Sequence, residues 1–342
     1  MVMNNIVIFG GCGFIGLYYA EELLKVNKNI NIYLADLKKP LDEFLKQKFD
    51  FLLKKQNVRY LNLDVRKSLE DINLEKIDHI ADFAAIHREP GHVHSEYFNT
   101  NVNGSKNICE FANKISCKNI LFASSISVYG KGEHEKTEMT NPIPNTSYGK
   151  SKLESENNYI RWQKNESKNK ILTICRPGVV FGPGEKGNVT RLVKAIKKRL
   201  FIFLGNKDVK KAGIYVKELV SILHWANTNQ LKKNFPRYVV FNASFIPCPN
   251  LNDYVKQICR VNKINNNFIS LPKTIIKFFL FLSSFVTRNI NTSSNFNYTR
   301  IMKLFRSNNI NSVFLAEKNY IFKYTIYDSL LDWKKTNLSD WE

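Results

Sequence analysis

A glycine-rich turn near the start of the chain constrains its fold more than any other feature. It reads GGCGFIG over residues 10–16 and lies between a candidate strand, Asn5–Phe9, and a candidate helix, Ile15–Val26. Glycine is needed where the chain turns tightly and where backbone approaches a pyrophosphate at a helix N-terminus. The turn therefore predicts a pyrophosphate-binding site, with Gly10, Gly13, Phe14, Ile15 and Gly16 as the contact residues. Glycine-rich turns also occur without a ligand, so the prediction of this site depends on residues further along the chain.

Short apolar runs alternate with amphipathic segments after this turn, which predicts an α/β, Rossmann-type doubly wound parallel sheet. Helices are expected at Ser95–Lys114 and Ser147–Gln163. In this 342-residue chain, residues 1–180 are predicted to form the sheet domain and residues 181–342 a smaller, mixed lobe that returns some strands to the sheet. The further candidate strands are Ile30–Ala35, Val58–Leu63, His79–Phe83, Asn119–Ala123 and Ile171–Cys175.

Acidic and small residues at the ends of the next strands fit a dinucleotide. Asp36 ends the second strand twenty residues beyond Gly16, where a carboxylate would accept the ribose hydroxyls of NAD. Lys38 and Lys39 come next and could instead pair with a 2′-phosphate, so NADP stays an alternative. The predicted contacts of the adenine are Asp64 and Val65, and those of the nicotinamide half are Ala84 and Ala85.

A tyrosine and a lysine four residues apart carry the clearest chemical signal. Tyr148 and Lys152 would share one face of a helix. An ammonium beside a phenol favours the phenolate, so we expect a lowered Tyr148 pKa and a proton acceptor for a substrate hydroxyl. Upstream, Ser125 ends the fifth strand and is the predicted partner of the same substrate oxygen; Ser124 and Ser127 are the alternatives that would only cap backbone.

Together these motifs resemble the extended short-chain dehydrogenase/reductase superfamily, specifically its sugar-nucleotide epimerase/dehydratase branch. The resemblance covers roughly residues 4–245 and rests also on FAAIHRE, NVNGS, SSISVYG, YGKSK and RPGVVFGPG. It implies that Ser125, Tyr148 and Lys152 are catalytic, with Tyr148 and Lys152 also meeting NAD. It further implies that Asn101 braces the site beside the cofactor. By the same resemblance, Arg176-Pro177 leads the chain towards the nicotinamide and substrate.

One departure from the branch narrows the reaction. Its dehydratases place an acid pair directly after the catalytic hydroxyl, whereas this chain has Ile126 and Ser127 there. Dehydration is therefore not expected. C4 epimerisation of a diphosphate-linked hexose through a 4-keto intermediate is the leading prediction, in surface polysaccharide or glycoconjugate synthesis. A C4 ketoreductase using NAD(P)H is the alternative.

Basic residues of the second lobe fit a diphosphate. Nine Lys/Arg and one acid lie between Lys186 and Lys211, and half of these charges are expected on a solvated helix face. The amides of a helix starting near Gly187 would add to the charge. Together with the pattern at Ala85–Arg88, this lobe resembles epimerases that act on polyprenyl-diphosphate sugars. The predicted substrate contacts are Arg88, Ser125, Asn188, Arg191 and Lys211.

The net charge of +21 favours anionic partners, but codon bias towards Asn and Lys explains much of it. A non-catalytic, nucleic-acid-binding protein of dehydrogenase fold is a remote alternative, because no nucleic-acid module or basic-aromatic interleaving is present, and no nucleic acid is expected as a partner. Six scattered cysteines favour a reducing cytosol and no metal site. The resemblance adds a homodimer formed by two helices near the fourth and fifth strands.

An apolar segment near the C-terminus predicts contact with a membrane. Nine of the twelve residues in 275–286 are apolar, four of them Phe. As a helix over 272–288 it would reach about 25 Å, short of a comfortable span, so an in-plane helix on an anionic membrane surface is predicted. The alternative is a helix buried in the lobe or covered by a partner subunit. The expected location is cytoplasmic and peripheral to the membrane.

Overall fold

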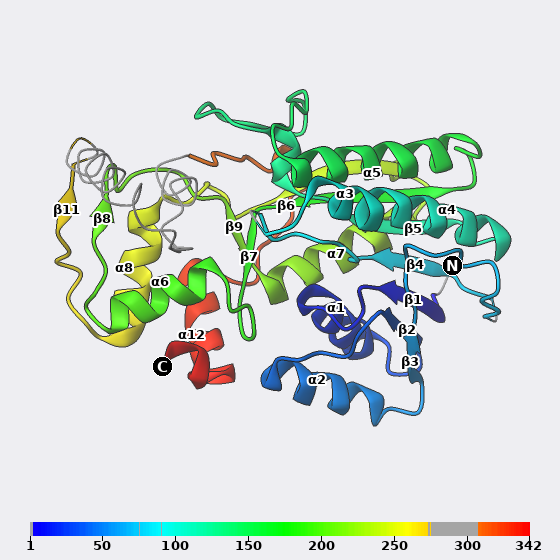
Figure 1. Ribbon diagram of the computed structural model, residues 1–342, viewed down its shortest axis with the longest axis horizontal. Helices are drawn as coiled ribbons and strands as arrows, with labels where there is room; N and C mark the ends of the chain where they lie inside the picture. Colours follow the sequence, from blue (N-terminus) through cyan, green and yellow to red (C-terminus); the bar gives the residue numbers. More distant parts are fainter. Residues whose placement is uncertain (1–2, 75, 90, 273, 275–306) are drawn as a thin grey trace, which may run out of the picture.

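The computed structural model describes residues 3–74, 76–89, 91–272, 274 and 307–342. Its centre is a seven-stranded sheet in the order β10-β6-β5-β4-β1-β2-β3, in which every neighbouring pair is parallel (Figure 1). This confirms the predicted α/β class, and each expected strand lies within two residues of an observed one. The strands are β1 (Asn5–Phe9), β2 (Asn31–Asp36), β3 (Val58–Asn62), β4 (His79–Asp82), β5 (Asn119–Ala123), β6 (Ile171–Pro177) and β10 (Tyr238–Ala243).

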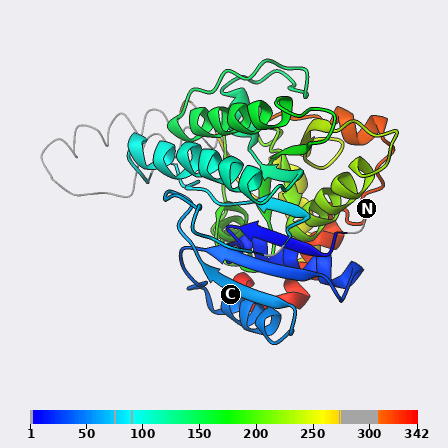
Figure 2. The same ribbon diagram turned by 90° about the vertical axis from the view of Figure 1, so that its right-hand side faces the viewer.

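Helices cover both faces of the sheet, as a doubly wound topology requires. On one face, α4 (Gly104–Lys114) packs beside α5 (Ser147–Lys164), and on the other, α1 (Phe14–Val26) packs between α2 (Glu43–Leu53) and α7 (Val216–Gln230) (Figures 1 and 2). The strands are buried on both sides, so their apolar residues divide into two cores. Pairing of two chains through α4 and α5 stays a prediction.

The helix expected at 95–114 is not regular. It begins as α3 (His94–Tyr97), widens into a π-helical turn at Phe98–Asn103 and continues as α4. A π-turn inserts one extra residue per turn, which rotates the side chains after it, and such turns often lie at functional sites. Here the turn contains Asn101, which reaches the loop after β4.

The rest of the described chain forms a smaller lobe and two returns to the sheet domain. Helix α7 and strand β10 belong to the sheet layers, although they come after residue 180. The lobe has two small sheets, which pair β7 (Val179–Phe181) with β9 (Gly213–Tyr215) and β8 (Phe203–Leu204) with β11 (Ser270–Leu271). Its helices are α6 (Asn188–Lys197), α8 (Leu251–Asn262), α11 (Val313–Glu317) and α12 (Ile326–Thr336).

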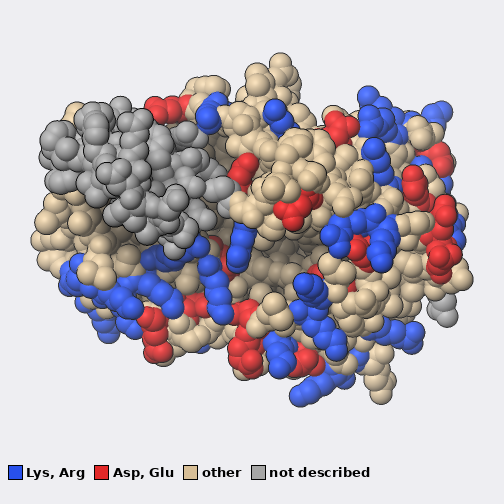
Figure 3. All heavy atoms as spheres, viewed as in Figure 1, with Lys and Arg blue, Asp and Glu red and all other residues tan. Residues whose placement is uncertain are grey.

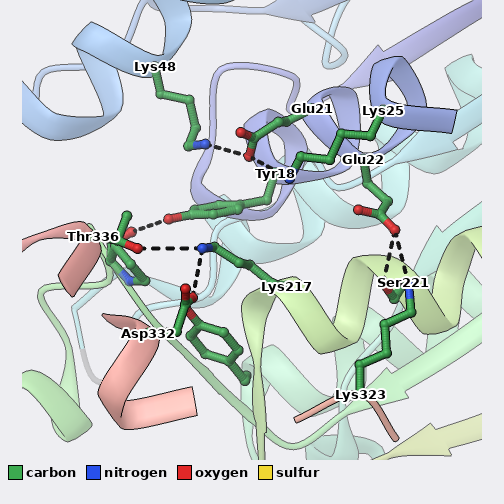
Figure 4. A network of polar contacts seen from close by, with 12 residues as sticks. Tyr18, Glu21, Glu22, Lys25, Lys48, Lys217, Ser221, Lys323, Asp332 and Thr336 are labelled. Atoms are coloured by element: carbon green, nitrogen blue, oxygen red, sulfur yellow. Dashed lines mark hydrogen bonds and ion pairs between the residues drawn. The ribbon is translucent and has the colours of Figure 1, made fainter. Parts of the chain in front are cut away.

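Polar contacts join the C-terminal part of the chain to β9, α7 and α1 (Figure 4). Asp332 accepts hydrogen bonds from Tyr215 and from Lys217 Nζ, the latter at 2.7 Å. Nearby, Lys323 Nζ bonds Ser221, whose hydroxyl donates to Glu22 at 2.9 Å. These contacts link residues between 102 and 199 positions apart, so the lobe is held against α1 and α7 by polar as well as apolar contacts.

Within the described ranges, no helix is long and apolar enough to cross a membrane. The predicted helix over 272–288 lies outside them, except for Pro272 and Thr274. All six cysteines are buried free thiols.

Candidate active site

The glycine turn packs so closely that side chains are excluded from it. Gly10 has a φ of +69°, and a Cβ there would lie 2.6 Å from the Ala84 amide nitrogen at the end of β4. A Cβ at Gly16 would overlap the Gly10 carbonyl. Gly13 starts α1, is exposed and provides no side-chain cap, so the first amides of this helix are not occupied by a capping side chain. Helix-start amides that glycines leave accessible fit a pyrophosphate.

Asp36 closes the far side of this turn. Its Oδ2 accepts a hydrogen bond from the Cys12 amide at 3.1 Å, and burial raises the pKa of its carboxyl. Asp64, the predicted adenine contact, is instead held by Arg66, which forms two parallel bonds to its carboxylate at 2.8 and 2.7 Å. The hydrogen bonds from Arg66 hold the pKa of Asp64 below its usual value. Val65 beside it packs close to Gly104 of α4.

Asn101 braces the loop that leaves β4. Its Oδ1 accepts from the Ile86 amide at 2.9 Å, and its Nδ2 donates to Ser151 Oγ on α5 at 2.8 Å. The loop carrying Ala84 and Ala85 is thereby fixed against the helix that carries Tyr148. This geometry is what the predicted bracing role requires.

The structure brings the three predicted catalytic residues to one place. Thr146 caps α5 by accepting from the Gly149 amide at 3.1 Å, which sets Tyr148 in the first turn. The Ser125 hydroxyl lies near the Tyr148 phenol and acts to lower its pKa. Lys152 lies one turn later and is 2% exposed, with its ammonium 4.3 Å from the centre of the Phe122 ring on β5.

The expected lowering of the Tyr148 pKa is wrong for this cofactor-free structure. Burial raises the pKa of Tyr148 to about 12, against a smaller effect of the Ser125 hydroxyl. Burial lowers the pKa of Lys152 to about 8, while the carboxylates of Asp82 and Glu156 act to raise it. The Lys152 ammonium faces the Phe122 ring, so it does not act on the phenol as the i,i+4 spacing suggested.

Neighbouring serines separate into different roles. Ser124 donates its hydroxyl to the buried carboxylate of Glu156, so it faces away from Tyr148. Ser125 Oγ accepts from the Ser127 amide and donates to Ser127 Oγ, both at 3.1 Å, and thus caps the 3₁₀ turn Ile126–Tyr129. The hydroxyl predicted as catalytic therefore also stabilises backbone, the role expected of its alternatives.

A buried ion pair behind the site was not predicted. Arg176, beside Pro177 at the end of β6, forms two bonds to Glu156 of α5, at 2.9 and 2.6 Å. Its third contact is the Tyr129 hydroxyl at 3.0 Å, which in turn donates to Asn242 of β10. The pair joins α5, β6 and the turn after Ser125. The only sequence signal was a Glu two helical turns after Tyr148.

The candidate substrate residues lie on the lobe and on the loop after β4. The chain beyond Lys211 passes against Gly178, and Ala212 packs with Val128 of the turn next to Ser125. Lys211 comes directly before Ala212 in the chain, and burial lowers its pKa to about 8. Arg88 is exposed, and its carbonyl accepts from Tyr97.

The helix start at Gly187 differs from the expectation. Glu185 accepts from the Thr190 amide at 3.2 Å and from the Thr190 hydroxyl at 2.6 Å. One helix-start amide is therefore already occupied by a carboxylate, which disfavours a phosphate at that amide. Asn188 and Arg191 are exposed and bond each other at 3.3 Å.

Figure 3 shows the molecular face hollowed near its centre, between the end with α6 and α8 and the end with the sheet.

Known proteins resemble this chain in sequence and in fold. The family model described as "NAD dependent epimerase/dehydratase family" matches residues 6–241. A relative from Escherichia coli O157:H7, named N-acetyl-alpha-D-glucosaminyl-diphospho-ditrans,octacis-undecaprenol 4-epimerase, is 31% identical over 75% of this chain and 71% of its own. An Escherichia coli dTDP-4-dehydro-6-deoxyglucose reductase is 28% identical over 64% of this chain and 70% of its own.

Solved structures share the whole fold. The UDP-glucuronic acid 4-epimerase of Bacillus cereus, in complex with NAD, has a TM-score of 0.75 at 17% identity and covers 99% of this chain and 100% of its own. The dTDP-glucose 4,6-dehydratase of Bacillus anthracis, also with NAD, has a TM-score of 0.70 at 17% identity and covers 99% and 98%. At this identity the likeness shows the fold alone.

Proposed function

The chain belongs to the NAD-dependent epimerase/dehydratase family, and from this premise we propose that it epimerises C4 of a diphosphate-linked hexose. The observation that carries the proposal is the placement of the Ser125 hydroxyl near the Tyr148 phenol, one helical turn from the buried Lys152. The acid pair that would assist loss of water is replaced by Ile126 and Ser127. What remains at the site is proton transfer at one hydroxyl.

The residues at the carboxyl ends of the parallel strands fit NAD. The uncapped start of α1 and the close-packed glycines suit its pyrophosphate, and Asp36 suits the adenine ribose. Val65 and, on release from Arg66, Asp64 would meet the adenine; Ala84, Ala85, Asn101 and Pro177 would border the nicotinamide half. NAD held by these residues would supply the hydride acceptor, and then the hydride donor, for C4. NADP stays the alternative because Lys38 and Lys39 come directly after Asp36 and Leu37.

Side chains of the protein transfer the proton to and from the sugar O4. Tyr148, as phenolate, takes the O4 proton while Ser125 donates a hydrogen bond to the same oxygen. The Lys152 ammonium stabilises the negative charge of the phenolate once its side chain turns from the Phe122 ring towards the phenol. The 4-keto sugar then rotates in the site and presents its other face to the hydride. As C4 is reduced in the opposite configuration, Tyr148 returns the proton to O4.

A diphosphate linked to a lipid is the carrier that we favour. The E. coli relative is named for a sugar joined through a diphosphate to undecaprenol. In this chain Lys211 comes directly before Ala212, which shares an apolar cluster with Val128 of the turn next to Ser125. A buried amine whose pKa is lowered regains a stabilised charge beside a diphosphate. Arg88, Asn188 and Arg191 are the further candidates for the diphosphate and the sugar.

Cofactor content after purification tests the proposal. An epimerase returns its hydride each turnover, so the purified protein should retain NAD and convert a diphosphate-linked hexose with none added. A C4 ketoreductase, which the similarity to the dTDP-4-dehydro-6-deoxyglucose reductase favours, would need stoichiometric NAD(P)H and a 4-keto substrate. Activity that depends on added NAD(P)H would therefore replace the first proposal by the second.

We also propose that the lobe meets an anionic membrane, where a lipid-linked substrate would be found. The support comes from a surface that we call the α6 tip, where α6 ends and β8 pairs with β11. It combines exposed apolar side chains with cations, and Figure 3 shows Lys and Arg gathered over α6 and α8. Such a surface suits anionic lipid headgroups. The tip consists of Leu200, Ile202 and Ile269, which are 73%, 41% and 69% exposed, and of Lys194, Lys197, Lys198 and Arg199.

Flotation with phosphatidylglycerol vesicles tests this surface. Wild type should float, and the double variant Leu200→Glu/Ile202→Glu should not. The matched control changes Leu41 and Ile143, which are at least as exposed elsewhere, to Glu. Equal flotation of both double variants, or none by wild type, would remove the α6 tip from the proposal.

A further inference from the structure

A second carboxylate lies close to Lys152, on strand β4, which leads into the loop that would border the cofactor. Asp82 is the last residue of β4 and is 2% exposed. Its Oδ2 accepts from the Tyr159 hydroxyl at 2.6 Å, and its Oδ1 accepts from the Ala84 amide at 2.9 Å. Neither the proton transfer nor the cofactor contacts proposed above use this side chain, so a buried carboxylate here requires a physical explanation.

The surroundings of Asp82 form a closed cluster with Lys152. Asp82 and Phe122 are register partners on neighbouring strands, so their side chains lie side by side on one face of the sheet. The Phe122 ring lies 4.3 Å from the Lys152 ammonium and 4.7 Å from the Tyr159 ring. Lys152 and Tyr159 are two turns apart on the same face of α5. One helix face therefore presents both a cation and a hydroxyl to this strand end.

Lys152 is the cation that acts on the buried carboxylate of Asp82. Among the described residues, no cation lies within 4 Å of its carboxylate, whereas Glu156, the other acid near Lys152, is paired with Arg176. A buried carboxylate is costly unless a charge or hydrogen bonds stabilise it. The cation that acts on Asp82 is Lys152, and its charge lowers the pKa that burial raises.

Asp82 also binds the backbone of the loop that would border the cofactor. The Ala84 amide that it binds is the same atom against which Gly10 packs without space for a Cβ. A single carboxylate therefore fixes the backbone at the glycine turn with one oxygen and faces the catalytic helix with the other.

We propose that Asp82 is a positioning residue for the catalytic lysine: its carboxylate provides the counter-charge that keeps Lys152 protonated at neutral pH. The catalytic meaning of this role rests on the proposed function, because a protonated Lys152 is what stabilises the Tyr148 phenolate. The other titratable groups around the pair are Glu156 and Tyr159 from α5, His87 from the loop after β4 and Cys109 from α4.

The test is a titration of Lys152 in the cofactor-free protein, followed by the NMR shifts of its Cε and Nζ and assigned by their loss in Lys152→Met. In wild type the pKa should lie near 8. Asp82→Asn keeps an acceptor for the Ala84 amide and removes the charge, so the Lys152 pKa should fall by about one unit. Asp78→Asn, at the other end of the same strand, should leave it unchanged, since that carboxylate binds the Asn4 and Asn5 amides. Equal titrations in Asp82→Asn and Asp78→Asn would overturn the proposal.

Two further variants separate charge from structure. Tyr159→Phe removes a hydrogen bond of Asp82 and no charge at neutral pH, so the Lys152 pKa should stay near that of wild type. A shift as large as that of Asp82→Asn would mean that structure, and not charge, is responsible. Should Asp82→Asn not fold, Lys152→Met gives the reciprocal test: the Asp82 carboxyl should then protonate at a higher pH, and an unchanged titration would overturn the proposal.

Turnover provides the last readout. In Asp82→Asn the alkaline limb of the pH profile should move to lower pH by the same amount as the Lys152 titration, and an unmoved limb would contradict the role in catalysis. The titrations need no substrate. Failure to find epimerase activity would therefore leave them intact, and failure of the titrations would leave the epimerase proposal intact.

Discussion

Glu156 and Arg176 face each other in the protein interior, joined by bonds of 2.9 and 2.6 Å between the carboxylate and the guanidinium. Both are almost fully buried, and Glu156 also accepts from Ser124. The pair connects the helix of Tyr148 with the strand that ends in Pro177. It therefore holds α5 against β6.

Removing one charge of this pair should destabilise the fold. Glu156→Gln leaves Arg176 charged and buried, which costs about 3–5 kcal/mol in the free energy of unfolding. Urea denaturation followed by circular dichroism measures the loss. Glu154→Gln, on the partly exposed face of the same helix, is the control and should cost less than about 1 kcal/mol. Equal stability of the two variants would show that the pair contributes little.

Closing the space at the glycine turn should release the cofactor. A Cβ in Gly16→Ala overlaps the Gly10 carbonyl, and overpacking of this kind costs about 1–3 kcal/mol. Because the turn must keep this conformation to bind the pyrophosphate, the NAD affinity should fall about 5- to 150-fold. The NAD content of the purified protein, measured after acid release, reports this. In Gly91→Ala the added Cβ meets only ordinary contacts at 3.5 Å, so its NAD content should match wild type. Full NAD content in Gly16→Ala would contradict the assignment of this turn.

Much of this fold is predictable from local patterns. Asn5–Phe9, the glycines after it and Asp36 predict a β-α-β unit and its ligand edge, because periodicity and backbone chemistry act over short stretches. The place of β10 beside β6 depends on packing between residues some 60 positions apart, which no local pattern encodes.

The site divides in the same way. Ser125, Tyr148 and Lys152 are recognisable from spacing, whereas Glu156 has the same sequence signature as a solvated helix acid such as Glu154. Asp82 gives a weak signal, since an acid inside the apolar run at 79–85 is unusual, but its partner on α5 becomes visible only in the folded chain. The predicted direction of the Tyr148 pKa shift is wrong because burial raises this pKa, and helical spacing reveals neither that burial nor where the Lys152 ammonium points.

Binding of a diphosphate should weaken as the pH rises through 8. Burial lowers the pKa of Lys211 to about 8, so the amine carries its charge at pH 7 and loses most of it at pH 9. If the charged form binds, affinity for a short-chain prenyl diphosphate should fall about tenfold between these values. Isothermal titration calorimetry at both pH values measures it. Lys211→Arg stays charged throughout, so its affinity should not change with pH in this range, and a wild type that behaves like this variant would exclude Lys211 from the diphosphate site.

Loss of the Tyr148 hydroxyl should stop proton transfer and spare the cofactor. Tyr148→Phe should reduce turnover by about 10²–10⁴, the usual contribution of a general acid–base group, with unchanged NAD content. Tyr97 lies beside it, with ring centres 6.3 Å apart, and binds the Arg88 carbonyl. Tyr97→Phe is therefore the matched control and should retain most of the turnover. Near-normal turnover by Tyr148→Phe would show that another group moves the proton.

Reversible hydride transfer at C4 can be followed directly with deuterium. Diphosphate-linked hexoses labelled at C4, on nucleotide and on prenyl carriers, are incubated with the purified protein without added cofactor, and the products are analysed by NMR and mass spectrometry. We expect the 4-epimer of one of these sugars with deuterium still on C4, since the hydride leaves and returns within one active site. An epimer that has exchanged its C4 deuterium for solvent hydrogen, or no epimer from any labelled sugar with NAD-loaded protein, would contradict this expectation.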